Sequence, residues 1–235
     1  MSTQGRCFAH NATSSHQFYL ALCASNDEVT TVKGWITTDF DAFKGKSIKL
    51  TRCYSMAASG DGGKVQGFHK ACDGKGPIVA VVQSKCFDGD AACKAKGGWR
   101  FGAVADESWS SIGSWVPSNA AFLYCLDCSG SKAAGKPAVH QLKLNGNANQ
   151  HAFVGHQSYG PFFGGAYDLV ISHQHLGVGP TSSSNLGSSY TCPYPALRGA
   201  LKKEKCQSYL AGSQVGGPEA KFIVQNYEVY TITEA

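Results

Sequence analysis

The sequence contains little charge and no long apolar run. Only 16% of its 235 residues are charged, and no stretch reaches the ~20 apolar residues that a membrane-spanning helix requires, so we expect no membrane insertion. The first residues, MSTQGRCFAHN, lack the apolar core of a signal peptide. Either the protein is cytosolic, or Met1 begins a mature or recombinant form from which a signal was removed.

Recognisable catalytic motifs are also scarce. The nucleophile motif Gly-x-Ser-x-Gly does not occur. Cys125 and Cys128 have the CxxC spacing of a redox or zinc motif, but no second CxxC or His pair accompanies them. His173 and His175 could face one zinc or copper ion from a strand, yet no third ligand is identifiable. These absences favour a protein that is not an enzyme and that holds neither a cofactor nor a metal ion.

The chain is instead rich in glycine and aromatic residues. It has 28 Gly, 12 Phe, 10 Tyr and 4 Trp, a mixture typical of β-rich domains with tight turns. Its net charge is +5, and the basic residues form only short clusters, as on an ordinary solvated surface. The alternative is weak attraction to an anionic polysaccharide or mineral, and nucleic acid is not an expected partner.

Cysteine is frequent and spread over the whole chain. The chain has ten cysteines, an even number, and this is typical of oxidised proteins outside the reducing cytosol. A glycosylation sequon at Asn11 is compatible with secretion. We therefore expect a secreted, extracellular protein with up to five disulfides, some of them local. The candidate disulfide cysteines are Cys7, Cys23, Cys53, Cys72, Cys86, Cys93, Cys125, Cys128, Cys192 and Cys206.

The hydrophobic pattern predicts many strands and few helices. Residues 77–84 are apolar almost throughout, which predicts a central strand buried on both faces. The other predicted strands span 47–55, 99–106, 120–128, 139–144, 151–156, 166–172 and 221–233. Short helices are predicted at 35–46, 65–72 and within 196–212, and turns or loops at 85–98, 159–161 and 177–191. The expected fold class is mainly β, a β-sandwich of antiparallel sheets with a few short peripheral helices.

Several motifs occur in an order that resembles the TLDc domain family over roughly residues 47–232. They include LTRCYSMAASG, the turn CDGKGP before a hydrophobic strand, the strand WRFGAVAD, and the C-terminal strand from Phe222 to Tyr230. Two further motifs are GPFFGGAYD (160–168) and SSSNLGSSY (182–190). The family-motif positions in these two segments are Gly160, Pro161, Phe163, Gly164, Gly165, Ser184, Asn185, Leu186 and Gly187.

The resemblance implies a β-sandwich flanked by short helices and a family for which no reaction is generally accepted. Intracellular members are associated with protection against oxidative damage and with binding the V-type ATPase. The ten cysteines and the inserted loop 85–98 depart from that intracellular pattern. We expect residues 1–46 to be an N-terminal extension packed on a TLDc-like domain that spans 47–235.

Asp168 and Glu228 are the acidic residues that the family pattern retains. Both lie beside or within predicted core strands, where a carboxylate must be paired or hydrogen-bonded. They either form an acidic ligand site, with oxygen ligands for a cation, or anchor backbone amides or an arginine near a bend. The sequence favours the structural role.

The predicted function is that of a non-catalytic extracellular binding or structural (matrix) protein. Its partner would be an unknown protein, a glycan, or an anionic matrix or mineral. The first alternative is a lectin-like protein that binds carbohydrate or an anionic surface, and the second is a redox-protective protein. Six aromatic residues could form a surface that stacks on sugars, or could belong to the core. They are Trp99, Trp109, Trp115, Tyr159, Phe162 and Phe163.

Overall fold

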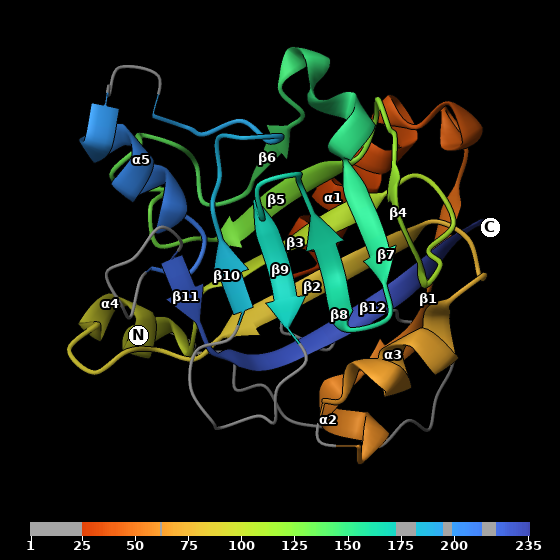
Figure 1. Cartoon of the computed structure of the whole chain (residues 1–235), viewed down its shortest axis with the longest axis horizontal. Coiled ribbons are helices and arrows are strands. Elements are labelled where there is room, and N and C mark those ends of the chain that lie inside the picture. The colour runs from red at the N-terminus through yellow and green to blue at the C-terminus, as the bar shows by residue number, and fades with distance from the viewer. Residues whose placement is uncertain (1–24, 62, 173–181, 195–198, 213–219) are drawn as a thin grey trace.

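The computed structural model describes residues 25–61, 63–172, 182–194, 199–212 and 220–235. In this part of the chain the strands form two antiparallel sheets that lie one in front of the other (Figure 1). Cys7, Cys23, the sequon at Asn11, and His173 and His175 lie outside the described residues.

Sheet A has six strands, and among them are the first and the last strand of the described chain. In spatial order the strands are β1 (Ile48–Ser55), β12 (Val224–Glu234), β2 (Ile78–Ser84), β3 (Arg100–Ala105), β5 (Phe122–Asp127) and β6 (His140–Lys143). The strand β2 is buried along almost its whole length, which confirms the predicted central strand.

Sheet B also has six strands and lies in front of sheet A in Figure 1. Its spatial order is β11 (Ala220–Phe222), β10 (Ser182–Ser184), β9 (Leu169–Ser172), β8 (Tyr159–Phe163), β7 (Phe153–His156) and β4 (Ile112–Val116). The mainly β class with two antiparallel sheets agrees with the sequence prediction.

The main hydrophobic core fills the space between the sheets. It joins side chains such as Phe101 of sheet A and Phe222 of sheet B, whose ring centroids are 5.4 Å apart. Trp109 is fully buried there and stacks on Phe153. Alternate strand residues point into this layer, as the period of two requires.

Helix α1 (Asn26–Asp39) covers the other face of sheet A. Its buried Val32 and Ile36 pack with Val79 and Phe122 in a second hydrophobic cluster. The helix begins with a capping box in which Ser25 and Glu28 each bind the other's backbone amide. The helix predicted at 35–46 is therefore wrong in its bounds: only the short 3-10 helix η1 (Asp41–Phe43) follows α1.

The remaining helices are short. They are α2 (Met56–Ser59), α3 (Val65–Cys72), α4 (Ala91–Lys96), the 3-10 helix η2 (Gly146–His151) and α5 (Gly199–Gln207). The prediction at 65–72 is confirmed by α3, whereas α4 lies inside the segment 85–98 that was expected to be a loop.

Three strands of sheet B occupy segments that do not look like strands in the sequence. The predicted turn at 159–161 is wrong, because these residues open β8, and the bulge between Tyr159 and Phe162 accommodates Pro161. Likewise β10 forms within the predicted loop 177–191, and β4 forms in a segment for which no strand was predicted.

Candidate functional site

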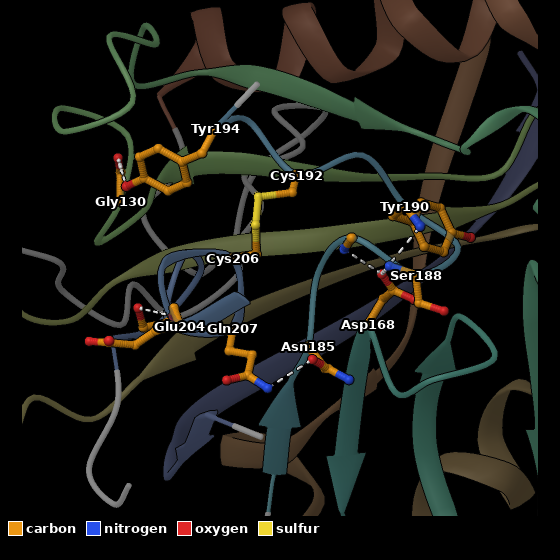
Figure 2. The surroundings of a disulfide bond; sticks show 12 residues. Gly130, Asp168, Asn185, Ser188, Tyr190, Cys192, Tyr194, Glu204, Cys206 and Gln207 are labelled. Carbon is orange, nitrogen blue, oxygen red and sulfur yellow. Dashed lines mark hydrogen bonds between the residues drawn. A yellow bond between two sulfur atoms is a disulfide. The ribbon is translucent and has the colours of Figure 1, made fainter. Parts of the chain in front are cut away.

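Asp168 lies directly before β9 and is fully buried. Its Oδ1 accepts hydrogen bonds from the backbone amides of Gly187 at 3.1 Å, Ser188 at 3.2 Å and Tyr190 at 3.2 Å, and its Oδ2 accepts one from Ser189 at 2.9 Å. Figure 2 shows the loop folded around this carboxylate. The carboxylate therefore satisfies four backbone donors of one loop.

Position 164, which lies beside this carboxylate, requires glycine. Gly164 has φ +83°, a conformation that residues with a Cβ rarely adopt, and a Cβ there would lie 2.1 Å from Asp168 Oδ2. Asn185 extends the same assembly, because its Nδ2 donates to Ala166 O at 2.8 Å and its Oδ1 accepts from Gln207 Nε2 at 3.1 Å (Figure 2). The two family motifs thus meet around one buried carboxylate.

The burial of Asp168 makes stability depend on pH. Burial raises the pKa of Asp168 to about 6, against the opposing effect of the amides of Ser189, Tyr190, Ser188 and Gly187. The folded protein then binds the proton more tightly than the unfolded chain, so stabilisation is present below pH ~4 and is lost as the pH rises to about 6. The full change is about 3 kcal/mol. Urea unfolding across this range should show the change in the wild type and not in Asp168→Asn, and equal pH profiles would contradict it.

Glu228 lies in β12 of sheet A and is buried separately from Asp168. Its Oε1 accepts from Arg52 Nη1 at 2.9 Å, and its Oε2 accepts from the Tyr230 hydroxyl at 2.6 Å. Since Asp168 belongs to sheet B and Glu228 to sheet A, the structure does not bring the two acids together as one site. One contacts backbone amides and the other an arginine.

Eight of the ten cysteines form four disulfides in the described residues. The pairs are Cys53–Cys72, Cys86–Cys93, Cys125–Cys128 and Cys192–Cys206. The last pair ties α5 to the loop that follows Tyr190 (Figure 2). The described residues hold no group of three His, Cys, Asp or Glu side chains placed to bind a metal ion.

The CxxC pair is buried in the main core. Cys125 and Cys128 are almost inaccessible to solvent, whereas reactive redox cysteines lie in partly exposed, electropositive surroundings. The disulfide between them is therefore positioned to act as a structural cross-link at the end of β5.

A Ser, a His and an Asp do meet, and sequence analysis did not single them out. Ser111 Oγ lies 2.7 Å from His69 Nδ1, Asp73 Oδ1 lies 3.0 Å from the same nitrogen, and the Ser111 hydroxyl also donates to Asp73. His69 Nε2 faces the backbone carbonyls of Tyr159 at 2.8 Å and His156 at 3.1 Å. A hydrolytic triad needs the serine and the acid on opposite ring nitrogens, so this cluster instead links α3 to the turn between β7 and β8.

The outer face of sheet B carries a connected group of aromatic side chains, which we call the aromatic face. Its centre is Phe162, which packs with Val154 and Val170 in a cluster separate from the main core. Around Phe162 lie Trp115 at 5.5 Å, Tyr159 at 5.6 Å and Tyr167 at 5.3 Å between ring centroids. No described helix lies over this face in Figure 1.

Two histidines extend the aromatic face at its margins. His151 lies 5.3 Å from Trp115, and His156 lies 5.3 Å from Tyr159, between ring centroids. Of the six aromatics considered in the sequence, Trp115 and Tyr159 belong to this face, and Phe162, which is itself buried, supports the rings around it. Trp99, Trp109 and Phe163 are buried in the main core, so they cannot contact a sugar.

Tyr167 is the most unusual member of the aromatic face. It has φ +65° and is the one non-glycine residue with positive φ among the described residues. A bulky side chain in this left-handed region costs about 1–3 kcal/mol. The residue is nevertheless 44% exposed, and its ring stacks on Phe162 with an interplanar angle of 18°. The sequence feature that marked Tyr167 was its position in the motif GPFFGGAYD, but a motif does not reveal that a residue has a positive φ.

These layers, cross-links and buried loop anchors define a mainly β, two-sheet domain. The family model of the TLDc domain matches residues 25–233, and the chain belongs to this family, which confirms the resemblance. The match includes α1, which lies within the segment 1–46 that was expected to be an extension. A comparison with curated proteins finds no match. None of the described helices has the length and apolar character of a membrane span.

Proposed function

We propose that this TLDc-family chain is a non-enzymatic recognition protein of an oxidising extracellular compartment, and that its aromatic face binds carbohydrate. The observation that carries the proposal is Tyr167, whose ring is held exposed on Phe162 at the cost of a left-handed backbone. Strain of this kind tends to persist at functional positions. The four described disulfides support the compartment, since such cross-links persist where thiols are not kept reduced.

The chemistry of the aromatic face suits a sugar ring. Carbohydrates present apolar C–H faces that stack on aromatic rings, and their hydroxyls need nearby polar groups. Tyr159 and Tyr167 supply a ring with a hydroxyl each, and His151 and His156 stand beside the platform. A matrix role through glycans would follow from the same face. A redox-protective role has less support, because Cys125 and Cys128 are buried and bonded to each other.

Replacing Tyr167 should separate stability from binding. Asparagine tolerates left-handed backbone, so Tyr167→Asn should raise the free energy of unfolding by about 1 kcal/mol. The same change should weaken glycan binding roughly tenfold, because one stacking ring is lost. A glycan array, followed by calorimetry on the best glycan and by denaturant unfolding, measures both quantities.

Ile112→Ser is the matched control, since Ile112 is 73% exposed on the neighbouring β4 but contributes no ring. It should bind like the wild type, whereas Trp115→Ala should bind as weakly as Tyr167→Asn. Binding by stacking should also persist at high salt, whereas attraction between the +5 chain and an anionic matrix should fall steeply. Full glycan binding by both aromatic variants would refute the proposed function.

A further inference from the structure

The side chain of His69 joins three segments that lie far apart in the sequence. It comes from the last turn of α3 and is largely buried. It contacts Ser111, which directly precedes β4, and the backbone carbonyls of His156 and Tyr159 on either side of the turn between β7 and β8. Figure 1 shows α3 beside this turn. A hydrogen-bonded side chain with partners on several segments restrains all of them.

Both ring nitrogens of His69 face hydrogen-bond acceptors. Nε2 lies 2.8 Å and 3.1 Å from two carbonyl oxygens, which accept hydrogen bonds and cannot donate them. Nδ1 lies 3.0 Å from Asp73 Oδ1 and 2.7 Å from Ser111 Oγ, and the single proton of the Ser111 hydroxyl is donated to Asp73 Oδ2. All of these contacts are satisfied when each nitrogen carries a proton, so the ring is an imidazolium whose Nε2–H is aimed at the turn.

The hairpin of β7 and β8 needs such a restraint at its turn. The backbone pairing of these two strands includes Phe153 and Phe163, which lie at the end of the hairpin away from the turn. Nearer the turn, Pro161 has no N–H to donate to a neighbouring strand. The carbonyls of His156 and Tyr159 accept from His69 instead. The contact with His69 therefore closes the turn end of the hairpin.

The two residues whose carbonyls contact His69 also contribute rings to the aromatic face. The ring of Tyr159 lies 5.6 Å from Phe162 and 5.3 Å from His156, between centroids. The ring of His156 is also oriented by the turn, because its Nδ1 accepts from the backbone amide of Ser158 at 3.2 Å. The backbone that His69 holds thus determines where both rings stand.

We propose that His69 is a positioning residue for carbohydrate binding, because it holds the turn from which Tyr159 and His156 extend into the aromatic face. Asp73 and Ser111 orient the imidazolium for this role. The inference rests on the proposed function and names the residue that pre-organises its site. A binding surface whose side chains are already ordered loses less conformational freedom when the ligand binds, and so binds more tightly.

Two substitutions separate the contacts of the two ring nitrogens. In His69→Gln the side-chain amide reaches the position of Nε2 and can donate to both carbonyls, whereas in His69→Asn the shorter amide reaches only the position of Nδ1. By calorimetry, His69→Gln should bind the best glycan within about threefold of the wild type, and His69→Asn about tenfold more weakly, since Tyr159 and His156 must then be ordered on binding. Both variants lose the ring that packs 4.8 Å from Phe68, so a purely structural role would weaken both alike.

Amide hydrogen exchange of residues 157–160, measured on the whole protein without glycan, reports directly on the turn. Exchange there should be faster in His69→Asn and close to the wild type in His69→Gln. Asp73→Ala removes the carboxylate that accepts from Nδ1, so it should speed exchange as well, and it covers the case in which His69→Asn fails to fold. Lys70→Gln, on the exposed side of the same helix, is the matched control and should leave both exchange and glycan binding unchanged.

The two measurements distinguish this inference from the proposed function. If the wild type binds no glycan, the proposed function fails, and hydrogen exchange still decides whether His69 holds the turn. Three results would each overturn the positioning role: exchange at the turn is unchanged in His69→Asn and Asp73→Ala, the two His69 variants weaken glycan binding equally, or the turn loosens in His69→Asn while its glycan affinity stays that of the wild type.

Discussion

Asp168→Ala should lose the native fold under mild conditions. The substitution leaves the four amides of residues 187–190 buried without an acceptor, and each unsatisfied buried donor costs about 1–3 kcal/mol. The pKa of about 6 already combines the burial of the carboxylate with the opposing bonds from these four amides, so it gives no separate gain to set against their loss. The resulting decrease of several kcal/mol is a large part of the ~5–15 kcal/mol that stabilises a domain.

Asp168→Asn is the matched control. It can keep three of the bonds through its oxygen, but its NH₂ group faces the amide of Ser189, so one bond is lost. Chemical denaturation should therefore rank the wild type above Asn and Asn well above Ala. If Ala and Asn unfold within about 1 kcal/mol of each other, Asp168 does not organise the loop through its amides.

The strands that could be predicted are those whose own residues make the apolar pattern. The strand β2 is buried on both faces because α1 covers one and sheet B the other, and its unbroken apolar run reflects this. The strand β10, by contrast, consists of three serines. Its place is set by pairing with β9 and β11, a tertiary effect that local propensity does not contain.

The sequence prediction misplaced helix α1, although the sequence contains the signal for its start. Ser25 and Glu28 have the spacing of a capping box, but the prediction followed the spacing of Trp35, Ile36, Phe40 and Phe43. The last two residues are buried outside the helix, around η1. Apolar spacing alone did not distinguish a helix from the turn that follows it.

The candidate site was predictable in residue type and not in geometry. Asp168 is a buried acid, but its partners are backbone amides some twenty positions away in the chain, and every residue except proline carries the same amide, so the sequence does not indicate which ones bind. Glu228 was chosen with it, yet the two belong to different sheets. Tyr167 was missed because its importance lies in a positive φ and a stacked, exposed ring.

Reduction of the disulfides should destabilise the protein by an amount comparable to its total stability. The four described bonds close loops with sequence separations of 19, 14, 7 and 3 residues. Chain entropy assigns about 3 kcal/mol to each of the two longer loops and about 2 kcal/mol to each of the shorter ones, or about 10 kcal/mol in all. A thiol reductant should therefore unfold the chain near room temperature, as followed by tryptophan fluorescence and circular dichroism.

Paired serine variants assign this loss to individual bonds. Replacing Cys53 and Cys72 together should cost about 3 kcal/mol, and replacing Cys125 and Cys128 together should cost less, because the unfolded chain gains less freedom from the shorter loop. In denatured but unreduced protein from its natural source, at most Cys7 and Cys23 should react with a thiol reagent, since the other eight cysteines are paired. Eight or more reactive thiols, or an unchanged melting temperature in reductant, would show that disulfides do not stabilise this domain. The proposed extracellular role would then lose its main physical support.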